Sequence, residues 1–440
     1  MELGAEALAD ALLRLADQDQ AAQDLVERLV ATPQEFIARF NQVTSSLKRS
    51  RRFVRWGESA GFARELSALL QGLESAVSDP RTGAEMVARF YQADKGVLGH
   101  CDDSSGHVGD VFRHQAKDLF VGYAARCEDK AWLADLVLKL NRQDDFGVRD
   151  ALIKCAAEYL PEPVIRTLIK RFEALAGKQG DEFDRRHWYH LVESLARQIK
   201  DAPLFERTRL AAWGEPPPTA ACIDIAKVYL ESGDAPAALA WLEKIPPKET
   251  FLATERDHLL LEVHARLGNP RQRTEVAWRI FRGARTARSL NSLLEVIGEE
   301  RREEVLAGEI VTILAQDTLF LENAAFLVEV GRWQEAEDYL LNRSEQINGD
   351  HYGLLLPMAQ SLEEQGRVLA ATALYRALLD SILRRAQTKT YPHGVRYLKK
   401  LERLAPRISD WRTLSPHADY VQNLRQQHGR KSSFWAKYHS

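Results

Sequence analysis

The sequence predicts an all-α protein, an α-solenoid of antiparallel helical hairpins, and three observations support this fold class. Apolar residues recur with helical spacing in almost every segment, and alternating patterns typical of strands are nearly absent apart from residues 52–56. In the second half, a glycine returns about every 34 residues between two amphipathic stretches, which is typical of helical-hairpin repeats. These glycines are Gly233, Gly268, Gly298, Gly331 and Gly366.

Capping patterns mark the starts of several helices. Thr32 is a suitable N-cap, Pro33 fits the first helical position, and Glu35 completes a capping box. The apolar spacing of Leu25 and Leu29 predicts a further helix just before this one. The same pairing of a capping residue with proline recurs at Asp79-Pro80, Asn269-Pro270 and Ser415-Pro416.

Sequence patterns divide the chain into four regions. Residues 1–100 form a helical start with a basic connector, and residues 101–213 hold several longer helices. The clearest linker is Gly214–Pro218, because its three consecutive prolines cannot lie inside a helix. Residues 219–387 carry the glycine repeats, and residues 388–440 form a helical cap with a basic and aromatic tail.

The glycine repeats carry small and aromatic residues at fixed offsets. Around Gly233, Ala226 and Tyr229 precede the glycine, and Ala238 follows it by five residues. Small residues at these positions let two antiparallel helices approach closely, and the aromatic ring fills the groove between hairpins. This pattern resembles tetratricopeptide repeats (TPR), so the C-terminal half is expected to be TPR-like. The same offsets give Ala324 and Ala336 in one unit and Ala359, Ala371 and Tyr375 in another, whereas Arg273 and Glu303 depart from the pattern.

Two parts of the chain resemble an uncharacterised bacterial family related to the helical region that accompanies SWIM-type zinc fingers. They are CDDSSGHVGDVF at 101–112, and the ending with YLKKLERLAPRISDW at 397–411 and YVQNLRQQHGRKSSFW at 420–435. The resemblance implies an α-helical architecture and a bacterial origin. In those relatives a Cys-x-Cys zinc finger precedes the helical part. No Cys-x-Cys occurs in this sequence, so the resemblance implies neither zinc nor DNA binding.

Composition favours a soluble protein of a reducing compartment, and we expect a cytoplasmic location. The formal net charge is −3, which lacks the basic excess expected of a dedicated nucleic-acid binder. No run of 18 apolar residues occurs, and the N-terminus lacks the basic region of a signal peptide. The four cysteines have no paired spacing and are expected to be free thiols: Cys101, Cys127, Cys155 and Cys222.

The densest group of metal-capable side chains comprises Asp103, His107, Asp110 and His114. If a helix starts just before His107, the last three share one face, because positions i, i+3 and i+7 align. The alternative, which we favour, is that Asp103 or one of the two serines after it caps this helix. No standard metal site has this spacing of ligands, so we expect no bound metal.

Two other constellations have a functional and a structural interpretation. The segment around Ser59 matches G-x-S-x-G, but nothing in the sequence predicts the parallel sheet that supports a nucleophilic serine. His187, His190 and Glu193 share a helix face, and Asp184 lies one turn earlier. We interpret this face as a polar stripe and Ser59 as a structural residue.

A basic and aromatic segment at residues 48–56 is the best local candidate for phosphate contacts, with Phe53 or Trp56 able to stack on bases. The alternative, which we favour, is a solvated connector whose arginines pair with acidic neighbours. In the C-terminal tail, Phe434 and Trp435 are expected to dock the last helix onto the end of the solenoid. The binding candidates of the segment are Lys48, Arg49, Arg51, Arg52, Arg55 and Trp56.

Taken together, these patterns predict a non-enzymatic scaffold that binds a protein or peptide along the concave face of residues 219–387 and needs no cofactor. The first helix of each hairpin supplies that face, so Lys227, Asn323 and Gln360 are candidate contacts. The alternative is a nucleic-acid-associated accessory protein that uses residues 48–56. A metal-dependent hydrolase built on the cluster around His107 is a third hypothesis.

Overall fold

The computed structural model describes residues 4–17, 32–178 and 182–439, and it confirms the all-α fold class. Contacts divide the chain into two compact units, residues 1–251 (unit 1) and residues 252–440 (unit 2). Among the described helices, none combines the length and the apolar character that crossing a lipid bilayer requires.

The described part of the chain contains one β pairing, an isolated parallel bridge between Val54 and Cys101. The strand considered at residues 52–56 is thus reduced to a single residue pair. The helix expected around Leu25 and Leu29 lies outside the described residues.

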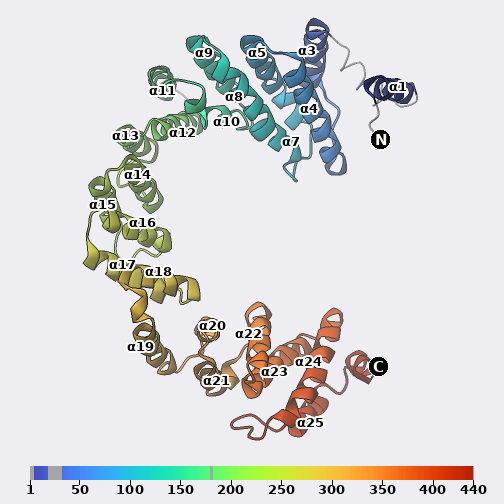
Figure 1. Ribbon diagram of the computed structural model, residues 1–440, viewed down its shortest axis with the longest axis vertical. Coiled ribbons are helices and arrows are strands. Elements are labelled where there is room, and N and C mark those ends of the chain that lie inside the picture. Colours follow the sequence, from blue (N-terminus) through green and yellow to red (C-terminus); the bar gives the residue numbers. More distant parts are fainter. Residues whose placement is uncertain (1–3, 18–31, 179–181, 440) are drawn as a thin grey trace. The chain divides into compact units, whose positions relative to one another are not determined.

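In unit 1, from α11 onwards, each helix packs on the next one in the chain (Figure 1). The elements are α1 (Ala5–Ala16), α3 (Pro33–Arg49), α4 (Trp56–Ala76), α5 (Pro80–Tyr91), α6 (Asp94–Leu98), α7 (His107–Asp110), the π-helix η1 (Val111–Ala116), α8 (Lys117–Arg126), α9 (Lys130–Asn141), α10 (Asp150–Ile153), η2 (Ala156–Glu158), α11 (Glu162–Ala176), α12 (Glu182–Gln198), α13 (Ala202–Trp213), α14 (Thr219–Ser232) and α15 (Ala235–Glu243).

Unit 2 continues with antiparallel pairs such as α16 with α17 and α22 with α23. Its elements are α16 (Ala253–Arg266), α17 (Pro270–Gly283), α18 (Ala287–Ile297), η3 (Glu299–Arg301), α19 (Arg302–Leu314), α20 (Leu321–Glu329), α21 (Trp333–Leu341), η4 (Ser344–Gln346), α22 (Tyr352–Glu364), α23 (Val368–Arg385), η5 (Thr388–Thr390), α24 (Tyr391–Leu404), η6 (Ala405–Arg407), α25 (His417–His428) and α26 (Ser432–His439).

Two of the predicted helix starts have the expected side-chain caps. The backbone N–H of Thr32 donates to Glu35 Oε2 at 2.9 Å, and the N–H of Glu35 donates to Thr32 Oγ1 at 3.3 Å, which confirms the capping box. Asp79 accepts from the N–H of Thr82 at 2.7 Å. The other two starts differ, because the side chain before α17 makes no capping bond and α25 begins one residue after its proline.

The proline segment lies inside unit 1, between helices that pack against each other. Helices α13 and α14 are in contact on either side of it. The carboxylate of Glu206, on α13, accepts from the Tyr229 hydroxyl of α14 and from Trp241 Nε1 of α15 at 3.1 Å. These side chains therefore join three helices across the segment, and the boundary between the two compact units lies between residues 251 and 252.

The five recurring glycines all have positive φ angles, from 67° to 102°, at the ends of helices. At Gly366, for example, the glycine N–H donates to Glu363 O at 3.0 Å and the N–H of Arg367 donates to Leu362 O at 2.8 Å. This pair of bonds is the Schellman closure, which requires a left-handed residue that glycine adopts without steric cost. The same closure ends the helices at Gly233, Gly268 and Gly331, whereas after Gly298 the chain passes through η3.

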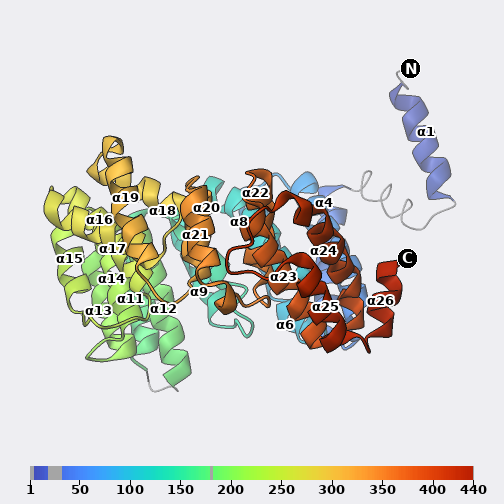
Figure 2. The same ribbon diagram turned by 90° about the horizontal axis from the view of Figure 1, so that it is seen from below.

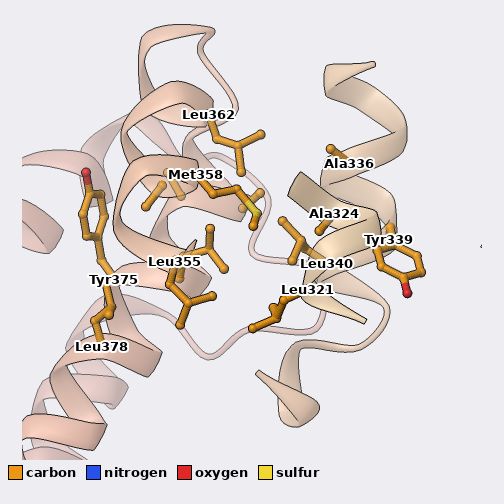
Figure 3. Packing of buried hydrophobic residues seen from close by; sticks show 14 of the residues in the cluster. Leu321, Ala324, Ala336, Tyr339, Leu340, Leu355, Met358, Leu362, Tyr375 and Leu378 are labelled. Atoms are coloured by element: carbon orange, nitrogen blue, oxygen red, sulfur yellow. The ribbon is translucent and has the colours of Figure 1, made fainter. Parts of the chain in front are cut away.

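Small residues lie where the helices of unit 2 meet. Ala324 of α20 and Ala336 of α21 are fully buried, and Leu340 lies beside Ala324 in the same core cluster (Figure 3). The alanines at the corresponding offsets around Gly233 and Gly366 are buried as well. The small residues that the repeat pattern predicts at these offsets are thus buried.

The last helix docks as expected. The Phe434 side chain is fully buried, and its ring meets that of Tyr391 edge-on, with centroids 5.6 Å apart. Helix α26 packs on α24, as Figure 2 shows, and Trp435 Nε1 donates to His428 O at 2.9 Å. A Cβ atom on Gly394 of α24 would lie 3.1 Å from the Phe434 ring, so glycine permits this close contact.

Gly366→Ala should lower the free energy of unfolding by about 1 kcal/mol, because alanine in the left-handed region carries a backbone cost. The space around this glycine is open, so no clash contributes. Gly353→Ala, inside α22 and equally open, is the matched control and should be neutral or stabilising. Urea denaturation measures both, and equal effects would contradict the turn-based explanation.

Phe434→Ala should lower the free energy of unfolding by about 3–5 kcal/mol, because it leaves a cavity between α24 and α26. Removing residues 429–440 should lower the melting temperature for the same reason. Phe320→Ala, at a phenylalanine that is about half exposed, should cost far less. A similar loss in the two alanine variants would show that the tail does not dock.

Candidate functional site

The polar loop before α7 caps the helix. Asp103 Oδ1 accepts from the N–H of Val108 at 2.9 Å, and its Oδ2 accepts from the N–H of Gly109 at 2.8 Å. Both oxygens thus satisfy backbone donors at the helix start, where a negative charge is favourable. The capping interpretation of Asp103 is confirmed.

His107, Asp110 and His114 do not converge on a metal position. The turn from residue 111 to 116 is a π-helix, whose longer turn moves residues out of the α-helical i, i+7 alignment. The remaining approach is His114 Nε2 to Asp110 Oδ1 at 3.9 Å, between exposed side chains. Within the described residues, no three His, Cys, Asp or Glu side chains gather in a way that would hold a metal ion.

Ser59 is a buried residue in the first turn of α4. Its hydroxyl donates to Trp56 O at 2.8 Å and lies 3.3 Å from Ser105 Oγ. Neither partner can take a proton from a serine, so this geometry does not activate a nucleophile. The serine instead connects α4 to the polar loop.

The polar stripe on α12 contains a buried carboxyl group. Glu193 Oε1 lies 3.2 Å from Arg209 Nε of α13, and Arg209 Nη2 lies 3.2 Å from Asp224 Oδ2 of α14. Burial raises the pKa of Glu193 from 4.5 to about 7, although the Arg209 charge opposes the shift. His187 Nε2 approaches Asp150 Oδ1 at 3.9 Å. The stripe is thus a set of contacts between helices.

The favoured interpretation of residues 48–56 was a connector whose arginines pair with acidic neighbours. The segment is more exposed and forms fewer ion pairs than that interpretation predicts. Phe53 and Trp56 are 57% and 64% exposed. Arg52 Nη2 lies 3.8 Å from Glu58 Oε1, and this is the one ion pair that the segment forms with the described residues. Lys48, Arg49, Arg51 and Arg55 are exposed without an acidic partner in that part of the chain.

The three candidate contact residues on the repeats differ in their exposure to solvent. Gln360 is exposed on α22, and Lys227 is half-buried on α14. Asn323 is only 6% exposed, and its Nδ2 donates to Gln316 Oε1 at 2.8 Å. Selecting Asn323 as a surface contact was therefore wrong, because the amide satisfies a neighbouring side chain instead of facing solvent.

Gln360 lies in a groove along α24, which we call the α24 groove. One part has a volume of about 770 Å³ and brings together α22, Tyr375 of α23 and the polar side of α24. A second part of about 400 Å³ adjoins it at His393 and Tyr397 and reaches the exposed side chain of Tyr352. The Tyr375 and Tyr397 ring centroids are 5.9 Å apart, so the groove has an aromatic floor.

The α24 groove carries positive charge without full compensation. Lys400 Nζ donates to both carboxylate oxygens of Glu363, at 2.9 and 2.8 Å. Arg396, Lys399 and Arg403 are exposed and have no acidic partner within the described residues. These cations were not among the candidate residues that the sequence pattern indicated. Their spacing along one amphipathic helix was the available signal, but only the packing of α24 places them beside α22.

The stability of unit 1 should fall as the pH rises from about 4.5 to about 7 through Glu193, because the folded state then holds a proton that the unfolded chain releases. Glu193→Gln removes this proton linkage. Relative to the unmodified protein, the variant should gain on the order of 2 kcal/mol between pH 5 and pH 8. Glu182→Gln, at an exposed position on the same helix, is the control. Urea denaturation at both pH values measures the free energies of unfolding. The same difference between Glu193→Gln and the unmodified protein at pH 5 and at pH 8 would contradict this prediction.

Comparison with known proteins identifies a family for the whole chain. A family of unknown function (DUF6880) matches residues 1–213 and 215–437, which include both units and the stretches at 101–112, 397–411 and 420–435. The comparison with curated proteins gives no match. Since the match extends over nearly the entire sequence, the chain belongs to this family of unknown function.

Proposed function

We propose that the protein is a non-enzymatic scaffold that binds an acidic segment of a partner protein in the α24 groove. The observation that carries this proposal is the set of exposed cations Arg396, Lys399 and Arg403, which have no acidic partner within the described residues and lie beside the Tyr375 and Tyr397 rings. A partner with acidic side chains would supply the missing counter-charges. Its apolar side chains would pack on the partly exposed Tyr397 ring, behind which Tyr375 is buried.

The two parts of the groove suit an extended peptide. The basic part along α24 attracts acidic residues, and complementary charge speeds association and fixes register. The adjoining part includes Leu378 and Ile382 of α23 and the exposed ring of Tyr352, which offer a place for an apolar or aromatic anchor. Buried anchors of this kind supply most of the affinity in protein interfaces.

The setting of this function is inferred from composition. All four cysteines are free, in agreement with the expected reducing compartment, and a cytoplasmic location follows as part of the proposal. No cofactor is part of it. The bacterial origin and the relationship to SWIM-associated helical regions remain predictions from resemblance.

The alternative is a nucleic-acid-associated protein that uses residues 48–56. It is favoured by the exposed Phe53 and Trp56 rings next to cations without acidic partners among the described residues. Aromatic stacking combined with basic side chains is a recurrent mode of single-strand binding.

Fluorescence anisotropy with a labelled peptide of glutamates around one phenylalanine tests the groove. The double variant Lys399→Glu, Arg403→Glu should weaken binding about tenfold or more, a change of about 1.4 kcal/mol or more. Arg407→Glu, an exposed cation in η6 outside the groove, should leave the affinity within about twofold of the unmodified protein, below 0.5 kcal/mol.

The same titrations with a labelled single-stranded oligonucleotide distinguish the alternative. Binding of the oligonucleotide, with loss in Arg51→Glu, Arg55→Glu and a steep dependence on salt, would favour the basic segment. Peptide binding that the groove variant leaves unchanged would overturn the proposed function.

A further inference from the structure

Unit 2 contains a second cavity, of about 830 Å³, that shares no residue with the basic part of the α24 groove. Its walls are the segment between α21 and α22, one side of α23, the loop before α25, and α25 itself. A volume of this size lies in the range of sites that enclose small molecules. Polar side chains dominate its walls, among them Arg376, Asp380, Ser381 and Arg384.

Arg376 is the unusual group in this cavity. The residue is only 6% exposed, yet its Nε and Nη2 atoms have no hydrogen-bond partner in the described residues. Its Nη1 donates to Ser415 O at 2.8 Å. The guanidinium carbon lies 5.1 Å from the Trp411 ring centroid and 4.3 Å from that of Tyr420. The two aromatic rings and Ser415 therefore hold the guanidinium in place while one edge stays unused.

In two other arginines of this chain, the buried Arg149 and the exposed Arg279, the same edge binds a carboxylate. Arg149 Nε and Nη2 donate to the two oxygens of Asp94, both at 2.7 Å. Arg279 donates to Asp257 through the same two nitrogens, both at 2.8 Å. This parallel pair of donors matches the two oxygens of a carboxylate. In Arg376 the same donor pair lacks its acceptor.

The neighbouring carboxylates do not fill this role. Asp350 accepts from Arg384 Nη2 at 3.0 Å and from the Ser381 hydroxyl, so it is already engaged. Asp380 Oδ1 accepts from the Tyr420 hydroxyl at 2.7 Å and forms no ion pair with Arg376. Burial raises the pKa of Asp380 and lowers that of Arg376. A buried cation without hydrogen-bonded compensation is costly, and this cost is removed when an anion binds.

We propose that this cavity is a binding site for a small organic carboxylate, whose two oxygens accept hydrogen bonds from Nε and Nη2 of Arg376. Both nitrogens are covered in the free protein, so the ligand enters as part of the wall moves. The wall here includes Thr413 and Leu414, which belong to the loop between η6 and α25 rather than to a helix. The site adjoins the second part of the α24 groove at Gly349, but the proposal does not rest on the proposed function.

Isothermal titration calorimetry of the full chain tests the site, with acetate and succinate as probes at concentrations up to about 20 mM, which detects millimolar affinity. The unmodified protein should bind at least one of them, and its melting temperature should rise with the ligand concentration. Arg376→Lys keeps the positive charge but loses the parallel donor pair, so it should weaken binding about tenfold or more.

Arg384→Lys is the matched control, because Arg384 lines the same cavity on the same helix but already pairs with Asp350. It should bind within about threefold of the unmodified protein, less than 1 kcal/mol. Should Arg376→Lys not fold, nitrogen-15 spectra of the unmodified protein serve instead, since a bound carboxylate shifts an arginine Nε–H resonance. No binding of either carboxylate, binding of phosphate alone, or equal binding by Arg376→Lys would overturn the proposal.

Discussion

The left-handed turn at a glycine is the constraint on which the hairpins depend. At Gly366 the backbone leaves α22 and enters α23 after only three residues, and only then can Ala359 and Ala371 bring the two helices into contact. A hairpin alone cannot cover its own apolar face, so each pair is stabilised by its neighbours. The glycine turn reverses the direction of the chain, and the small residues then let the two helices of a hairpin approach each other. The paired helices together present the apolar surface that the next helix covers.

Both units contain buried charged side chains that form hydrogen-bonded ion pairs, and the charged side chains without such a partner are informative. Asp94 and Arg149 satisfy each other with two parallel hydrogen bonds in unit 1. Glu309 of α19 accepts from Arg282 and Arg285 in unit 2. By contrast, two donors of the buried Arg376 have no acceptor within the described residues, and the exposed cations Arg396, Lys399 and Arg403 of the α24 groove have no acidic partner there. Both of our binding proposals come from such places.

Local features were predictable from the sequence, and features that depend on packing between distant segments were not. The caps at Thr32 and Asp103 and the turn at Gly366 involve residues within six positions of one another, so their geometry follows from the local sequence. The burial of Asn323 depends on how α20 packs, and the π-helix that displaces His114 does not follow from the apolar spacing of its residues. The α24 groove combines cations with rings from another helix, which a single-sequence reading cannot place together.

The contacts of Glu206 show that the proline segment does not determine how the helices around it are arranged. Because its carboxylate holds Tyr229 and Trp241, the arrangement of α13, α14 and α15 is set by side chains outside Gly214–Pro218. The segment therefore connects α13 to α14 but contributes little to their relative orientation. The family match is itself interrupted there, at residue 214. This segment is thus a suitable place for an epitope or a fluorescent reporter, because the contacts that join the helices on either side lie outside it.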